Sequence, residues 1–174
     1  VKKICFDIGD RLRKNWKGSK EELEQEFDRQ LADQEKGLNN MSVEDYQKGR
    51  ANYNQNIRGG TGSAQSQARA THETGLIDNF EKQLNKQGVV GEAAATQAKG
   101  MAKESMNSLA ALHSPDMVAG GKDVVSGMGD KKVNSSLGSQ WKDRVGDLDK
   151  QAAEVPESER RDTKMKVKLQ RCKK

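Results

Sequence analysis

The sequence predicts a mainly α-helical fold, a multi-helix single domain in which a small β element pairs the N- and C-terminal segments. Proline is rare (2 residues) while Ala, Gln, Glu and Lys are frequent, which favours helix. Apolar residues recur at helical spacing through most of the chain and alternate only near its two ends. A length of 174 residues suffices for one domain with a real core, so residues 1–174 are expected to form one domain.

Both terminal segments have the alternating pattern of short strands. Residues 3–8 alternate apolar with other side chains, and residues 165–169 alternate apolar side chains with lysines. Because two lone strands are marginally stable, we expect them to pair, which would bring Cys5 close to Cys172. A basic helix is the alternative for the C-terminal stretch. Two buried thiols are the expected state of the cysteines, with one disulfide as the alternative in an oxidising compartment.

The helices are predicted from start signals, apolar spacing and stop signals. Ser19 and Glu22 form a capping box, and this first helix should end near Gly37. Ser42 repeats the start signal. Further helices are expected over residues 64–85, over 92–112, and from a cap at 134 or 135 to Pro156. The fourth should bury Met101, Ser105, Leu109 and Leu112, and the last should bury Leu137, Trp141, Val145, Leu148 and Ala152. Residues 59–63 are glycine-rich and predict a flexible loop.

Charge and composition narrow the classes of partner. The net charge of +5 suits a polyanionic partner, and residues 163–174 contain six Lys or Arg and no acid. This basic stretch is either a solvated tail or a phosphate-facing surface. Neither a membrane span, a signal peptide nor zinc-ligand spacing is recognisable. The chain starts at Val1 without a methionine, so we expect a domain of a longer protein that carries any delivery signals.

The most informative motif is His113-Ser114-Pro115-Asp116. Pro115 should end the preceding helix near Leu112, because proline cannot continue a helix. Ser114 would then be the N-cap of a new turn and Asp116 its second residue. His113 would lie at the negative end of one helix dipole and Asp116 at the positive end of the next, so both charged forms would be favoured.

An imidazole beside a carboxylate can hydrolyse a phosphodiester. His113 could accept a proton from water or protonate the leaving oxygen. Asp116 could hold Mg²⁺ or fix the imidazole tautomer. One carboxylate is too few for a tight metal site, and the nearest further oxygen ligands in sequence are Asp123, Asp130 and Asn134. The structural alternative is a helix stop followed by an Asp-stabilised turn.

Three blocks of the sequence resemble a known family. They are LHSPDMVAGG at 112–121, GDKKVNSSLGSQW at 129–141, and a set that runs from FDRQL at 27–31 through Gln34, Glu35, Asn39 and Met41 to Arg50. Together they resemble the polymorphic toxin type 15 domain, the HxxD nuclease toxins of bacterial competition. The likeness extends from near the start of the chain to Trp141 and arguably to Cys172.

The resemblance implies a mainly helical toxin domain at the C-terminus of a secreted effector, often a type VI secretion cargo acting in the cytoplasm of a target bacterium. It implies cleavage of DNA that depends on Mg²⁺ or another divalent cation, with His113 and Asp116 essential. By analogy we expect a secretion carrier and an acidic immunity protein that blocks the HxxD cleft. Asp130 is a candidate second metal ligand, and the candidate substrate-binding residues are Arg50, Asn134, Lys164, Lys166 and Lys168.

Three other functions remain open at this stage. An RNase of the same fold is the nearest, because activating water near a phosphate does not distinguish the sugar. A non-enzymatic nucleic-acid-binding module would use residues 164–174 and ignore His113. A structural or adaptor domain of a secretion system would use the basic tail only for solubility.

Overall fold

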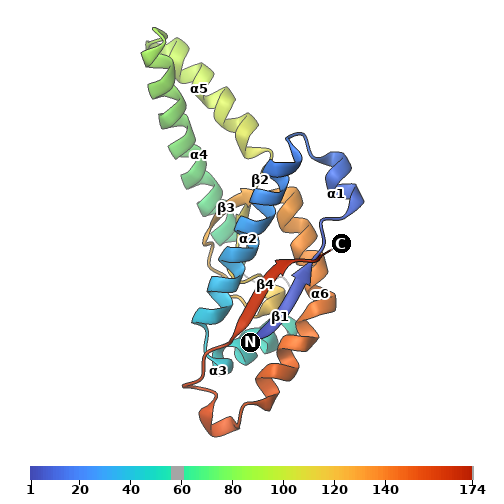
Figure 1. Cartoon of the computed structure of the whole chain (residues 1–174). Helices are drawn as coiled ribbons and strands as arrows, with labels where there is room; N and C mark the ends of the chain where they lie inside the picture. The colour runs from blue at the N-terminus through green and yellow to red at the C-terminus, as the bar shows by residue number, and fades with distance from the viewer. Residues whose placement is uncertain (56–60, 174) are drawn as a thin grey trace.

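The computed structural model describes residues 1–55 and 61–173 and confirms a mainly helical chain with a small β element joining its ends (Figure 1). None of the described helices combines the length and apolar character that a bilayer crossing requires. The elements are β1 (Lys2–Phe6), α1 (Asp10–Asn15), α2 (Lys20–Asn40), α3 (Val43–Gln55), α4 (Thr61–Lys86), α5 (Gly91–Met106), β2 (Leu109–Leu112), the 3₁₀ turn η1 (Met117–Ala119), β3 (Gly127–Asp130), α6 (Lys131–Glu154), the 3₁₀ turn η2 (Glu157–Glu159) and β4 (Val167–Arg171).

The predicted pairing of the chain ends is confirmed. β1 and β4 lie parallel, in a register that runs from Lys2 opposite Val167 to Phe6 opposite Arg171. Apolar side chains of both strands, such as Phe6 and Val167, are buried against α2 and α6, while Lys168 and Gln170 of β4 are exposed. This alternation excludes the basic helix that was the other interpretation of the C-terminal stretch.

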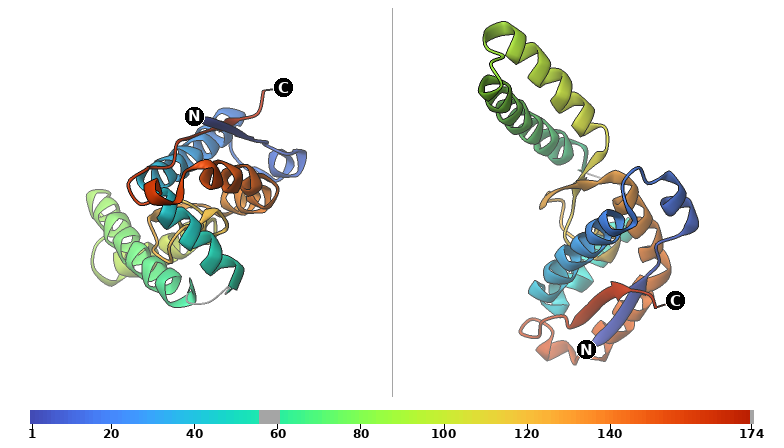
Figure 2. Two further views of the ribbon diagram at one scale, coloured as in Figure 1. Left: turned by 90° about the horizontal axis from the view of Figure 1, so that it is seen from below. Right: turned by 45° about the horizontal axis from the view of Figure 1, so that its top comes forward.

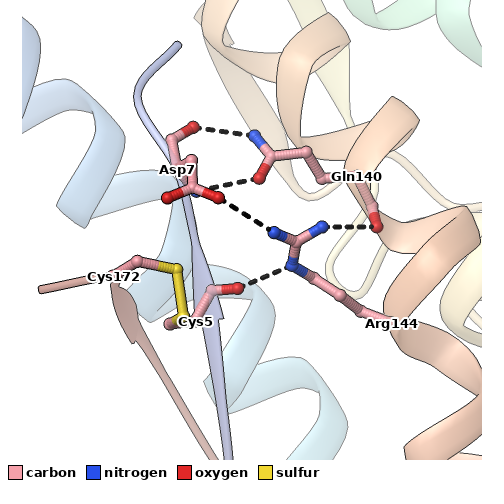
Figure 3. The surroundings of a disulfide bond; sticks show 5 residues. All are labelled: Cys5, Asp7, Gln140, Arg144 and Cys172. Carbon is pink, nitrogen blue, oxygen red and sulfur yellow. Dashed lines mark hydrogen bonds and ion pairs between the residues drawn. A yellow bond between two sulfur atoms is a disulfide. The ribbon is translucent and has the colours of Figure 1, made fainter. Parts of the chain in front are cut away.

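The expectation of two buried thiols is wrong, because Cys5 and Cys172 form a disulfide (Figure 3). The parallel register carries Cys172 one residue beyond β4, where its N–H donates to the Phe6 carbonyl at 3.0 Å and its side chain meets that of Cys5. Arg144 of α6 donates from Nε to the Cys5 carbonyl at 2.6 Å. The linked strands are therefore also attached to α6.

The main core lies between α2, α3, α6 and the terminal sheet. The capping box of Ser19 and Glu22 is present, and the predicted stripe of α6 from Leu137 to Ala152 is buried. The N-cap of α6 is Asp130, not Asn134 or Ser135 as predicted, because its Oδ1 accepts from the Lys132 and Val133 amides at 2.8 and 3.0 Å. The helix therefore begins a full turn earlier than expected.

Helices α4 and α5 form a hairpin that projects from the rest of the molecule (Figures 1 and 2). It has a small core of its own around Leu84, Ala94 and Ala98. Arg69 joins its base to the body by donating to the carbonyls of Met106 and Leu109 at 3.1 and 2.7 Å. Residues 59 and 60 of the predicted glycine-rich loop lie outside the described residues, and residues 61–63 begin α4.

The predicted helix over 92–112 is partly wrong. Helix α5 ends at Met106, and residues 109–112 form β2, which pairs antiparallel with β3 from Leu109 opposite Asp130 to Leu112 opposite Gly127. The buried face of α5 is also shifted, since Ala98 and Ala102 are buried whereas Met101 is 38% exposed. Pairing with a distant strand outweighs the helix propensity of a Leu-Ala-Ala-Leu segment.

Candidate functional site

His113 and Asp116 lie on the loop that connects β2 to β3. Asp116 is the N-cap of η1, and its Oδ1 accepts a hydrogen bond from the Val118 amide at 2.9 Å. The C-cap of η1 is Gly120, whose φ of +83° is a conformation that favours glycine. The carboxyl group is therefore fixed by the turn that it caps.

The predicted local geometry of this motif is wrong. The N-cap is Asp116 itself rather than Ser114, and His113 follows the strand β2 and not the end of a helix. Ser114 Oγ instead accepts from Ser126 Oγ at 2.9 Å, across the loop. The two candidate side chains thus owe their positions to turn hydrogen bonds and packing, not to helix dipoles.

Glycines on three helices let this loop lie directly on the helix backbones. A Cβ at Gly37 of α2 would collide with the Ser114 carbonyl, and one at Gly49 of α3 would collide with the Gly120 carbonyl. Gly138 of α6 faces Asp116, with only 3.3 Å between a Cβ built there and Asp116 Oδ2. This contact also explains why α2 continues past Gly37: the glycine serves close packing and not a helix end.

Gln34 of α2 is hydrogen-bonded to the loop that carries His113 and Asp116. It is 4% exposed, and its Oε1 accepts from the Asp116 amide at 3.2 Å and from Trp141 Nε1 at 2.6 Å. Trp141 is fully buried, so its N–H depends on this acceptor. One amide oxygen therefore joins α2, α6 and the backbone of Asp116.

Arg50 of α3 holds the next part of the loop. One guanidinium nitrogen, Nη1, donates to the Val118 carbonyl at 2.7 Å, while Nε and Nη2 form a paired contact with the Asp149 carboxylate, each at 3.0 Å. Tyr46 also donates its hydroxyl to Asp149 at 2.6 Å. Arg50, a predicted substrate-binding residue, therefore has a positioning role in this structure.

The two candidate side chains lie in a partly buried, charged environment. Burial raises the pKa of Asp116, while the Val118 amide and the charge of nearby His113 act in the opposite direction. The His113 side chain is 9% exposed, and its Nε2 lies 3.3 Å from Asp123 Oδ1. Asp123 is 28% exposed, so the imidazole and its carboxylate partner are not sealed from solvent.

A hollow of about 610 Å³ borders this arrangement. It is bounded by the loop residues Met117, Gly121, Lys122 and Asp123 on one side and by the end of α3 on the other. Asp123 thus contacts His113 and also lines the hollow. Neither His113 nor Asp116 is among the described residues that line the hollow, so Asp123 is the link between the hollow and the imidazole.

The side chains near Asp116 offer a hard divalent cation such as Mg²⁺ few protein ligands. Among the described residues no group of three His, Cys, Asp or Glu side chains could enclose a metal ion. Asp116 Oδ2, however, accepts no hydrogen bond from residues 1–55 or 61–173, and a cation there would offset the cost of a buried negative charge. Mg²⁺ commonly uses one or two carboxylates and completes its shell with waters and substrate phosphates.

The other predicted site residues are not brought to this loop. Asp130 lies at the far end of the β2–β3 pair, where it caps α6. Asn134 is half-buried on the first turns of α6. Lys164 Nζ donates to the Asn40 carbonyl at 2.8 Å, and Lys168 pairs with Glu35 at 3.4 Å. The side chain of Lys166 is exposed beside β4.

Sequence reasoning missed Gln34, Asp149 and the pairing of Asp123 with His113. Gln34 carried a usable signal, because it falls on the apolar stripe that continues from Leu31 and is a polar residue in a core position. Asp149 and Asp123 carried none, since their partners lie on other elements or across an irregular loop.

A comparison with protein families gives a match over most of the chain. The family model described as novel toxin 15 matches residues 21–172. The matched range covers the three sequence blocks quoted above, the loop of His113 and Asp116, and the chain as far as β4. Among curated proteins, none matches the chain significantly.

Proposed function

Because the chain belongs to the novel toxin 15 family of toxin domains, we propose that it is a nuclease toxin that hydrolyses phosphodiester bonds of DNA with His113 and Asp116. One observation carries the proposal: a buried carboxylate and a carboxylate-paired imidazole lie on one loop that borders an open hollow. A buried carboxyl group with a raised pKa, close to an imidazole and to a hollow, is a combination found at hydrolytic sites.

His113 acts as the general base. An ionised carboxylate can only accept, so Asp123 fixes the tautomer that carries the proton on Nε2 and leaves the lone pair on Nδ1. Nδ1 takes a proton from the attacking water as the water oxygen bonds to phosphorus and the bond to the leaving sugar oxygen breaks. Asp123 stabilises the resulting imidazolium, and the leaving oxygen is protonated from solvent.

Asp116 is the residue that would hold a divalent cation. A divalent cation, when bound, would polarise the phosphate and neutralise its developing charge. Asp116 Oδ2 is the oxygen that would hold it, since Oδ1 already accepts from the Val118 amide. Gln34 and Arg50 keep the Asp116 backbone in place, so the carboxyl group needs little reorganisation.

The toxin family supports the remaining parts of the proposal. We propose that the domain reaches the cytoplasm of a target bacterium as part of a secreted effector with a carrier protein, and that the producing cell protects itself with an acidic immunity protein that covers the loop of His113. The net charge of +5 would favour such a partner as well as DNA.

The test compares plasmid DNA and RNA as substrates for the wild-type chain and for His113→Ala and Asp116→Asn, each with Mg²⁺ or with EDTA. We expect the wild type to cleave DNA and not RNA. In both variants DNA cleavage should be at least about 100-fold slower, and EDTA should abolish it in the wild type. His72→Ala is the matched control, because His72 is the other histidine and lies on α4. Circular dichroism of each variant checks that it is folded.

The outcomes separate the competing functions. Cleavage of RNA but not DNA would assign the activity to an RNase. DNA binding without cleavage, with toxicity that survives both substitutions, would assign it to a non-enzymatic binding module. A DNase that is unaffected by full chelation would remove the metal from the proposal while leaving His113 in place.

A further inference from the structure

A second surface, outside the loop of His113, combines basic and hydroxyl side chains. Residues 11–20 contain five Lys or Arg and no acid, and α1, which begins at Asp10, packs against α6 (Figure 1). Between them lies a hollow of about 730 Å³. It is lined by Gly9, Arg11, Leu12, Asn15, Lys131, Lys132, Ser135, Ser136 and Ser139.

The charges of this hollow are not neutralised. Its lining holds three cationic side chains and no carboxylate. Within the described part of the chain, no ion pair joins Arg11, Lys131 or Lys132 to an acidic residue. The basic groups of β4 differ in this respect, since Lys168 pairs with Glu35 and Arg171 with Asp28.

A neighbouring hollow of about 570 Å³ extends the same surface. Lys131 and Lys132 line both hollows, and the second adds Lys17, Asn107 and Ser108. Three carboxylates, Glu22, Glu104 and Asp130, also line it, so its positive potential is weaker than that of the first hollow. The first hollow, which we call the α1–α6 hollow, is therefore the candidate site.

We propose that the α1–α6 hollow binds the phosphate backbone of the nucleic acid that the toxin cleaves, an inference that rests on the proposed function. Lysine, arginine, serine and asparagine side chains are the groups that commonly donate to phosphate oxygens. A protein partner fits less well, because protein interfaces are depleted in lysine and serine and enriched in aromatic residues, of which this lining has none. The α6 amides do not contribute, since Asp130 already occupies them.

The position of the hollow suits a duplex that also reaches Asp116. Lys131 and Lys132 precede Gly138 by about two helical turns, or roughly 10 Å along α6, and Gly138 is the residue that faces Asp116. One strand of DNA carries a phosphate about every 3.4 Å along the helix axis, so this distance spans about three phosphates. The axial spacing between the α1–α6 hollow and the part of α6 that faces Asp116 therefore matches a few phosphates of one duplex strand.

The test measures binding apart from cleavage. Fluorescence anisotropy of a labelled duplex is recorded in EDTA on the His113→Ala background, which removes turnover. Arg11→Gln with Lys131→Gln should weaken binding about tenfold at physiological salt and lower the slope of log affinity against log salt by about 2. Lys82→Gln with Lys99→Gln removes the same charge from exposed positions of α4 and α5 and should change affinity less than twofold.

A second pair of variants avoids any effect on folding. Ser135→Asp with Ser139→Asp places two carboxylates in the hollow from helix positions that are already exposed, and it should weaken binding at least as much. The proposal is wrong if neither pair of substitutions weakens binding more than the α4–α5 control does. It is also wrong if the weakening is seen with Lys164→Gln and Lys166→Gln and not with these two pairs. Loss of affinity for a captured acidic protein, with DNA affinity unchanged, would reassign the hollow to a protein partner. Because this assay measures binding without turnover, its result is independent of the cleavage test of His113 and Asp116, and the two proposals can fail separately.

Discussion

The buried amide of Gln34 should be the most sensitive support of the site. In Gln34→Leu the side chain keeps its approximate volume but two donors, Trp141 Nε1 and the Asp116 amide, lose their acceptor. Trp141 is fully buried, so its N–H carries the full penalty of about 1–3 kcal/mol for an unsatisfied group. The Asp116 amide belongs to a partly exposed residue and adds less. We expect a loss of about 2–4 kcal/mol.

Urea denaturation followed by circular dichroism measures this loss. For a chain of this size, the expected change corresponds to a melting temperature lower by about 5–15 °C. Cleavage should also fall, because the backbone of Asp116 loses its anchor on α2. Gln25→Leu is the matched control: Gln25 is exposed on the same helix, and its substitution should change stability by less than about 0.5 kcal/mol.

A double-mutant cycle decides whether the hydrogen bond is responsible. Trp141→Phe removes the indole donor, so adding it to Gln34→Leu should cost less than it does in the wild type, by about 1–2 kcal/mol. Additive losses within about 0.4 kcal/mol would refute the reasoning and assign the effect of Gln34→Leu to packing alone.

Three further predictions concern the same framework. Asp116→Asn should abolish cleavage yet be at least as stable as the wild type at neutral pH. Burial raises the pKa of this carboxyl group above its ordinary 3.8, so the stability of the wild type declines as the pH rises above that value. Urea titrations at several pH values should show this decline in the wild type and not in the variant. Arg50→Lys keeps the charge, but a lysine cannot reach both Asp149 carboxylate oxygens and the Val118 carbonyl at once. Thermal melting should show that the free energy of unfolding falls by about 1–3 kcal/mol. Reducing the bond between Cys5 and Cys172 should lower stability by up to about 5 kcal/mol, given their separation of 167 residues, while a double serine variant should be unaffected by the reductant.

Much of the helical framework could be predicted because its signals are short-range. The Ser19 capping box and the apolar stripe of α6 depend on residues within a few turns of one another. The pairing of the two chain ends followed from two lone alternating segments with no other available partner. The choice of His113 and Asp116 as candidates followed from the motif and the family resemblance.

The errors arose where a distant partner decides the local structure. Residues 109–112 have good helix propensity but form a strand, because β3 supplies their hydrogen bonds. Asn134 and Ser135 are residue types that favour N-cap positions. The N-cap of α6 is nevertheless Asp130, because β3 ends at that residue and its side chain accepts from the first helix amides. Gly37 looked like a helix end, although close contact with the loop of Ser114 is what requires it.

The amino-acid sequence by itself determined the helical class, the joined ends and the pair of residues proposed to carry the chemistry. Only the tertiary structure decided how that pair is held: Gln34 from α2, Arg50 from α3 and the partner carboxylate of Asp123 across the loop. The physical reason is that periodicity and capping act over a few residues, whereas a site is stabilised by hydrogen bonds between segments whose proximity exists only after the chain has folded.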